Sequence, residues 1–480
     1  MASLKSLARE TAIYGLSSIV GRFLNYLLVP LYTFRISSAS GGYGVITEIY
    51  AYVALLLVLL TFGMETTFFR FSNKEGEDAR RVYSTTLLAV LGVGVCFLAV
   101  IFGFLDEIAA FLHYSDHPEY LGMMAACVAI DAFQSIPFAY LRLQKRALKF
   151  AALKLLFIFL NISLNLLYYV VLGKSDVFYA FAINLFCTAL ITVFFYPELR
   201  CVRWTLDWPL LRRMLRYAWP ILILGIAGIL NQTADKLIYC RLVEGAAGKT
   251  QLGIYGACVK IAMIMAMITQ AFRYAYEPFV FGKVKEADSR QTYAAAMKYF
   301  VIFTLLAFLA VMAYLDVLKH IIAPDYWEGL DVVPIVMAAE IMMGIYFNLS
   351  FWYKLTDRTV WGAWFSGIGC AVLVAVNVLF IPQYGYMACA WAGCAGYGTA
   401  MLLSYFVGQR YYPINYPLKS IGSYVLLAAF FYAVMAFSAR FIDAFWGRIA
   451  VNTVCLALFA AHILYHDFRF WERGRKLSGN

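Results

Sequence analysis

The sequence lacks any hydrophilic segment long enough to fold outside its apolar stretches. Its longest polar interruption spans about residues 197–217, and charged residues make up only 14% of its 480 residues. It also contains no Gly-rich phosphate loop, no HExxH motif and no CxxC motif, the short patterns that carry catalysis or metal binding. Any function is therefore expected within the apolar segments or at their ends, and we expect a protein that is not an enzyme.

The ten cysteines do not form a disulfide framework, because nearly all of them lie in or beside apolar segments, where they are interpreted as small apolar residues. No cleavable signal pattern is expected at the start, since the first apolar stretch is long and carries Arg22 in its middle. A net charge of +11 would suggest nucleic acid in a soluble protein. Here the charge falls between apolar segments, so no nucleic-acid partner and no cofactor is expected.

Long apolar segments dominate the sequence. Hydrophobic residues make up 63% of it and the mean hydropathy is +0.73, values typical of a membrane protein. Each segment is long enough to cross a hydrocarbon core of about 30 Å as a helix. We predict fourteen membrane-spanning helices, at residues 11–35, 43–68, 82–105, 119–141, 150–172, 177–197, 217–240, 252–277, 292–315, 330–353, 359–381, 386–408, 420–439 and 447–466.

The positive charges between these segments alternate. With a cytoplasmic N-terminus, most of the 39 Lys and Arg residues fall in cytoplasmic loops and few fall on the other side. This is the distribution that the positive-inside rule requires. An even number of spans then places the C-terminus in the cytoplasm as well. The predicted fold class is an all-α polytopic membrane protein.

The two halves of the sequence share several features at a common spacing. Three pairs recur at equal separation: Gly44 and Gly253, Asp131 and Glu340, and Lys145 and Lys354. We therefore predict two six-helix lobes that enter the membrane in the same direction, related by a pseudo-two-fold axis along the membrane normal. The predicted division is an N-lobe (1–200), a cytoplasmic linker (201–216), a C-lobe (217–410), and two further helices with a cytoplasmic tail (411–480).

Basic residues within the spans are candidates for binding an anionic substrate. A charge in the membrane costs at least about 2.5 kcal/mol, so each should face a watery cavity or a partner. The candidates on helices 1, 2 and 8 are Arg22, Asn25, Arg70, Lys260 and Arg273. The planar guanidinium of Arg suits a diphosphate, because it binds phosphate oxygens through two hydrogen bonds.

Structural ion pairs are the alternative for these residues. Glu65 is a candidate partner for Arg22, and Glu277 is a candidate partner for Arg273.

Acidic and amide residues within the spans are candidates for ion coupling. An isolated Asp235 on helix 7 would hold a monovalent cation or a proton, and Asn377 on helix 11 would add an oxygen ligand. The neighbouring Lys236 leaves open the alternative that Asp235 is a structural partner of a base. Asp131 and Glu340 are further candidates. Of the many aromatic residues, those at span ends fit interfacial belts, and others would stack on sugar rings in a cavity.

Several stretches resemble a known family. They are Tyr14-Gly15 through Pro30 to Gly42-Tyr43-Gly44; Arg216-Tyr217-Ala218-Trp219-Pro220; Asn231-Gln232-Thr233-Ala234-Asp235-Lys236; Leu252-Gly253-Ile254-Tyr255-Gly256-Ala257 with Lys260; and Asn377-Val378-Leu379-Phe380-Ile381-Pro382-Gln383-Tyr384-Gly385-Tyr386. Over essentially its whole length the chain resembles the Wzx-type polysaccharide and oligosaccharide flippases. These belong to the multidrug/oligosaccharidyl-lipid/polysaccharide (MOP) exporter superfamily.

The resemblance implies a flippase that moves undecaprenyl-diphosphate-linked oligosaccharide across the bacterial inner membrane by alternating access, for surface polysaccharides such as lipopolysaccharide. Related lipid II flippases use cavity arginines on helices 1, 2 and 8, which Arg22, Arg70 and Arg273 match. They place a sodium site where Asp235 and Asn377 lie, so coupling to Na⁺ or H⁺ is implied. Implied partners are the lipid-linked oligosaccharide, membrane lipids, and polysaccharide polymerase or assembly proteins.

Two other functions compete with this one. A multidrug exporter of the same superfamily would have an acidic cavity, dominated by Asp131, Asp235 and Glu340. A glycan polymerase or acyltransferase would need a large outer loop or a histidine within the helix bundle, and the sequence provides neither.

Overall fold

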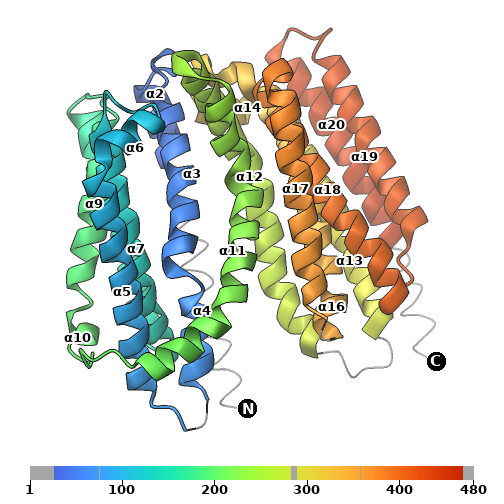
Figure 1. Cartoon of the computed structure of the whole chain (residues 1–480). Helices are drawn as coiled ribbons and strands as arrows, with labels where there is room; N and C mark the ends of the chain where they lie inside the picture. Colours follow the sequence, from blue (N-terminus) through green and yellow to red (C-terminus); the bar gives the residue numbers. More distant parts are fainter. Residues whose placement is uncertain (1–25, 75, 283–288, 357, 469–480) are drawn as a thin grey trace. The chain divides into compact units, whose positions relative to one another are not determined.

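The computed structural model of this protein describes residues 26–74, 76–282, 289–356 and 358–468, and every regular element in these ranges is helical (Figure 1). The predicted all-α fold is therefore confirmed. The described chain forms two compact units. The first comprises the described residues through Ala257 together with Leu373–Cys389, and the second comprises Cys258–Val372 and the described residues from Ala390 onward.

The first unit is built around α7, which packs against α5, α9 and α3. Its helices are α2 (Leu28–Arg35), α3 (Gly42–Thr61), α4 (Met64–Ser72), α5 (Ala79–Gly103), α6 (Leu105–Phe111), α7 (Pro118–Leu143), α8 (Ala147–Leu166) with the π-helical turn Leu167–Val171, α9 (Phe178–Val193), α10 (Tyr196–Leu199), α11 (Trp208–Leu242), the first turns of α12 (Gly245–Gly282) and the last turns of α17 (Val360–Tyr384). In the apolar part of α7, 61% of the residues are buried, whereas in the apolar part of α5 only 22% are. Helix α7 therefore lies at the centre of this unit.

The second unit is built around α13, which packs against α15, α19 and α20. Its helices are the rest of α12, α13 (Ser289–Ala313), α14 (Leu315–Leu318), α15 (Val332–Leu349), α16 (Phe351–Leu355), α17 before Leu373, α18 (Tyr386–Tyr411) from Ala390 onward, α19 (Leu418–Ser438) and α20 (Phe445–Ile463). Short 3₁₀ turns at Lys319–Ile321 and Pro324–Asp331 connect α14 to α15.

Eleven of the described helices are long and apolar enough to cross a membrane. They correspond to eleven of the fourteen predicted segments. Of the other three, 177–197 forms the shorter apolar helix α9, 386–408 forms the 26-residue α18, and 11–35 lies mostly outside the described residues. The chain is therefore a multi-pass helical membrane protein.

The segment predicted as one helix at 43–68 is broken in the structure. Phe62 and Gly63 both have positive φ angles, 34° and 72°, and separate α3 from α4. A Cβ atom on Gly63 would lie 3.0 Å from the side chain of Ile221 and 3.2 Å from the carbonyl oxygen of Ala218, both on α11. The break thus lets the backbone approach α11 closely, a requirement of tertiary packing that local hydropathy does not show.

Two glycines of the predicted repeat meet each other in the first unit. A Cβ atom on Gly253 of α12 would lie 2.9 Å from the backbone nitrogen of Gly44 on α3, and one on Gly44 would overlap the carbonyl oxygen of Lys249. Since α11 also packs along α3 and α4, this compact unit extends well past residue 200. The division into lobes at 1–200 and 217–410 rests on the repeat and stays a prediction.

Candidate substrate and ion sites

Arg70 lies in the last turn of α4, at the end that the predicted topology places in the cytoplasm. Its guanidinium carbon lies 4.0 Å from the centre of the Tyr217 ring on α11, a distance at which a cation is attracted to the ring face. In the same helix, Glu65 forms an ion pair with Arg142, whose guanidinium carbon lies 4.8 Å from the Phe69 ring. Glu65 and Arg142 therefore balance each other, whereas Arg70 presents an exposed guanidinium.

Two of the predicted substrate-binding residues, Arg22 and Asn25, lie outside the described residues. Glu65, the alternative partner of Arg22, already forms an ion pair with Arg142. The side chain of Glu277, the alternative partner of Arg273, also lies outside the described part of the chain.

Arg273 and Lys260 lie on α12 within the second unit. The guanidinium carbon of Arg273 lies 4.6 Å from the centre of the Phe347 ring on α15, and the side chain is exposed. Lys260 is half-buried, and both basic residues make further interactions. Like Arg70, Arg273 thus rests its cation on an aromatic ring.

Asp235 is buried on α11 and is not isolated. The ammonium of Lys236 lies 3.0 Å from its Oδ2 and 3.1 Å from its Oδ1. The Tyr255 hydroxyl also donates a hydrogen bond of 2.7 Å to Oδ2. In this arrangement an ammonium group, rather than a metal ion, balances the carboxylate, and a monovalent cation would have to displace Lys236. Asp235 is therefore paired with a base, and that base is its neighbour Lys236 rather than a residue elsewhere in the chain.

Asn377 on α17 is fully buried. Its Nδ2 donates to the carbonyl oxygen of Leu373 at 3.0 Å, while its Oδ1 has no hydrogen-bond partner among the described residues. An unsatisfied buried acceptor costs about 1–3 kcal/mol. Asn377 therefore keeps an open oxygen of the type that hard cations accept.

Asp131 is half-buried near the middle of α7. The Cys127 thiol, one turn earlier, lies 3.9 Å from its Oδ2. No described Lys or Arg forms an ion pair with it; the base within electrostatic reach is Lys154 on α8, whose Nζ lies 4.1 Å from the centre of the Phe138 ring. Its predicted counterpart in the repeat, Glu340 on α15, is half-buried and makes interactions of its own.

A chain of hydrogen bonds connects Asp131 to α2. Its members, which we call the relay, are Tyr32, Asn165, Asn161, Asn184 and Cys127, on α2, α8, α8, α9 and α7. The consecutive distances from Tyr32 to Cys127 are 2.9, 2.9, 3.0 and 3.2 Å. The polar groups of the relay are thus satisfied inside an apolar helix bundle, which rigidifies it.

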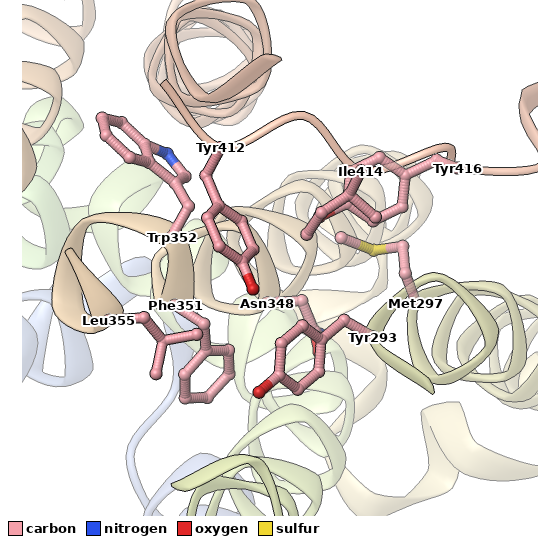
Figure 2. A pocket seen from close by; sticks show the side chains of 9 residues that line it. All are labelled: Tyr293, Met297, Asn348, Phe351, Trp352, Leu355, Tyr412, Ile414 and Tyr416. Atoms are coloured by element: carbon pink, nitrogen blue, oxygen red, sulfur yellow. The ribbon is translucent and has the colours of Figure 1, made fainter. Parts of the chain in front are cut away.

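A small aromatic pocket lies in the second unit, between α13, α15, α16 and the segment after α18 (Figure 2). It is lined by Tyr293, Met297, Asn348, Phe351, Trp352, Leu355, Tyr412, Ile414 and Tyr416. Its cavity volume of about 10 Å³ is close to the space that one water molecule needs and far below the range of roughly 300–1,000 Å³ that holds drug-sized ligands. The Asn348 Oδ1 is buried without a hydrogen-bond partner among the described residues, so the pocket suits a small polar group.

Sequence reasoning missed three features of these sites. It did not pair Glu65 with Arg142, since their distance in sequence hides their proximity. It selected neither Lys154 nor the relay. The spacing of Asn161 and Asn165, one turn apart in an apolar helix, was an available signal for a polar stripe. Cys127, interpreted as a small apolar residue, instead accepts a hydrogen bond from Asn184.

The long apolar helices and the charges among them define the class of multi-pass helical membrane proteins. Residues 38–330, more than half of the chain, match the family described as polysaccharide biosynthesis protein. The chain therefore belongs to the polysaccharide biosynthesis protein family. A search among curated protein sequences finds no match.

Solved structures with the same fold include a lipid II flippase and multidrug transporters. A lipid II flippase MurJ in an inward closed conformation superposes with a TM-score of 0.74 at 13% identity, covering 95% of this chain and 99% of that one. An inward-facing multidrug resistance MATE family transporter of the MOP superfamily gives 0.63 at 14% identity, covering 81% and 94%. An outward-facing MATE family transporter gives 0.55 at 16% identity, covering 84% and 95%. The family match confirms the predicted kinship with polysaccharide biosynthesis proteins, and the chain has the fold of these flippase and MATE structures.

Proposed function

We propose that this protein is a flippase that moves undecaprenyl-diphosphate-linked oligosaccharide from the cytoplasmic to the outer leaflet of the bacterial inner membrane. It would work by alternating access and would serve surface polysaccharide biosynthesis. The family match supports a role in polysaccharide biosynthesis, and the fold is one that a lipid II flippase also has.

The observation that carries the proposal is the presence of two exposed guanidinium groups at ends of membrane spans, which the predicted topology places in the cytoplasm. Arg70 and Arg273 each rest on an aromatic ring, Tyr217 and Phe347. The ring holds the guanidinium plane in place without neutralising its charge. A fixed guanidinium plane binds the oxygens of a diphosphate through paired hydrogen bonds, so the headgroup would be collected from the cytoplasmic leaflet.

Reconstituted transport tests the proposal. The purified protein would be placed in liposomes with a fluorescent diphosphate-linked lipid glycan, and a membrane-impermeant reagent would report its arrival in the opposite leaflet. Arg70→Ala and Arg273→Ala should each slow transport about tenfold, since a hydrogen bond to a charged group contributes about 1.5–3 kcal/mol. Arg440→Ala, at an exposed arginine on the opposite side, should leave transport unchanged. Absence of transport by the unaltered protein would refute the function.

The second candidate is a multidrug exporter, favoured by the half-buried carboxylate of Asp131, which suits a cationic substrate. A deletion strain that becomes drug-sensitive while its surface glycan stays normal would decide for the exporter.

Ion coupling and partners extend the proposal. Coupling to Na⁺ or H⁺ would use the acids within the spans, and polysaccharide polymerase or assembly proteins would receive the translocated glycan. An imposed Na⁺ or pH gradient in the same liposomes distinguishes the two ions.

A further inference from the structure

The relay is directional. The Tyr32 hydroxyl donates to Asn165, the Asn165 amide donates to Asn161, and the Asn161 amide donates to Asn184. The Asn184 amide then donates to the Cys127 sulfur, and the Cys127 thiol donates to Oδ2 of Asp131. Every donor therefore points along the same path toward one carboxylate.

A chain of aligned donors responds to the charge of its final acceptor. Hydrogen bonds to an ionised acceptor are roughly twice as strong as those between neutral groups, and each bond polarises the next. When Asp131 is ionised, the five bonds reinforce one another. When it is protonated, the acceptor of the Cys127 thiol loses its charge, and the chain back to Tyr32 on α2 weakens.

Among the described residues, no Lys or Arg forms an ion pair with Asp131. The elements packed on α7 are α3, α4, α5, α6, α8, α9 and α10. The titratable groups that face Asp131 are Lys154 on α8, Tyr50 on α3, Cys127 on α7 itself and, through Cys127, Cys187 on α9. Glu65 on α4 acts on Lys154 and is already paired with Arg142.

The remaining neighbouring helices contribute no opposing charge at this depth. Among the described residues, their charged groups lie at helix ends: Arg80 and Arg81 on α5, Asp106 and Glu107 on α6, and Glu198 on α10. Glu198 is held by Lys149 at 2.6 Å. Lys154 therefore attracts the ionised form of Asp131 without locking it in an ion pair.

We propose that Asp131 takes up and releases one proton in each transport cycle, and that the relay transmits its protonation state to α2. The proton passes from water to a carboxylate oxygen and later returns to water, so no other reactant is needed. This inference deepens the proposed function by naming H⁺ as the coupling ion, and its role in coupling rests on that function.

Infrared difference spectroscopy tests proton binding without any transport. For the full-length protein in lipid vesicles, a change from alkaline to acidic buffer should produce a carboxylic-acid carbonyl band, together with a shift of a thiol S–H band. Because the chain has 28 Asp and Glu residues, each variant is compared with the unaltered protein in a double-difference spectrum. For Asp131→Asn this spectrum should contain a carbonyl band and the thiol shift, and for Cys127→Ala only the thiol shift. For the double variant Asp235→Asn with Lys236→Gln, the Asp131 carbonyl band and the thiol shift should cancel. Absence of a carbonyl band from the double-difference spectrum for Asp131→Asn would overturn the proposal.

A second variant tests the proposal even if Asp131→Asn fails to fold. Lys154→Met removes the neighbouring positive charge, so the carbonyl band should persist to higher pH, while Lys154→Arg should keep the original titration. An unchanged titration in Lys154→Met would contradict the arrangement proposed here.

Transport in liposomes then tests coupling. A pH gradient should accelerate glycan movement by the unaltered protein, and Asp131→Asn should lower the rate to that seen without a gradient. Acceleration by Na⁺ alone would overturn the coupling role. Titration of Asp131 in a protein that moves no glycan would instead refute the proposed function and leave the proton site intact.

Discussion

Two carboxylates in the membrane spans of the first unit have opposite surroundings. Asp235 on α11 is held by Lys236 at 3.0 Å and by the Tyr255 hydroxyl at 2.7 Å. Asp131 on α7 has a thiol at 3.9 Å, and Lys154 lies beyond ion-pair distance. Among the described residues, Asp235 is thus paired with a base, whereas Asp131 is hydrogen-bonded by uncharged groups, the Thr188 hydroxyl and the Cys127 thiol.

The difference shows how a transporter can use the same residue type for two purposes. Removing one partner of a buried ion pair is strongly destabilising, because the remaining charge stays buried without a partner. Such a pair therefore has a structural role. A half-buried carboxylate with weak partners changes its protonation at little cost and serves as a switch. Residue type and depth put Asp235 ahead of Asp131 as an ion-coupling candidate, and only their neighbours show that Asp235 is the one held by a base.

The largest effect on stability is expected when the counter-charge of Asp235 is removed. Lys236→Met would leave a buried carboxylate without its counter-charge and should destabilise the protein by about 3 kcal/mol. Lys236→Arg keeps the charge and should have a much smaller effect. Thermal unfolding of the purified proteins in detergent would measure both. Equal stability of Lys236→Met and the unaltered protein would mean that this ion pair does not fix Asp235.

A smaller loss is expected when the second partner of Asp235 is removed. Tyr255→Phe deletes a 2.7 Å hydrogen bond to the carboxylate and should cost about 2 kcal/mol, the usual range for a bond to a charged group. Tyr384→Phe, on an exposed tyrosine of α17, is the matched control and should be neutral. The same unfolding experiment compares them. A Tyr255→Phe protein as stable as its control would contradict a strongly held Asp235.

The sequence predicts the spans well, because each span is recognised from its own hydropathy and from the Lys and Arg residues at its ends. It did not predict the break at Phe62 and Gly63, since this break depends on the approach of α11. The same limit applies to the sites. Arg70, Arg273 and Asp131 were recognised as charges in apolar segments, but whether a charge is paired depends on which helices meet.

The amide residues illustrate this limit most clearly. Asn161 and Asn184 lie on different helices and each looks like an isolated polar residue in its own segment. Their bond, and its continuation to Cys127, exist only because α7, α8 and α9 pack together. A cysteine carries no signal in the sequence that separates a packing role from a hydrogen-bonding one.

A third carboxylate, Asp207, lies outside the spans and also has strong partners, so it can be compared with the two acids within the spans. Asp207 accepts a hydrogen bond of 3.1 Å from the backbone nitrogen of Leu210 and pairs with Arg81. These contacts, the backbone bond first, lower the pKa of Asp207. Asp207→Ala removes the cap of α11 and should cost about 1 kcal/mol, while Asp207→Asn keeps a capping oxygen and should cost less.

The lowered pKa of Asp207 also predicts a pH dependence. Its stabilisation is fully present above the ordinary aspartate pKa of about 3.9 and is lost as the pH falls through the lower value of the folded protein. The stability difference between the unaltered protein and Asp207→Ala should therefore shrink in acid. A difference that stays constant down to strongly acidic pH would show that the carboxylate charge does not contribute.

The smallest effect on stability is expected at Lys154, and it completes the comparison. Lys154→Met keeps an apolar side chain against the Phe138 ring and removes a charge that does not form an ion pair with Asp131. The loss should stay below about 1 kcal/mol, the range of weakly coupled charges and exposed cation–ring contacts. The same substitution at Lys236 is expected to cost about three times as much. If thermal unfolding gave equal losses for the two lysines, Asp131 would be held as firmly as Asp235, and it would have no freedom to act as the proton switch.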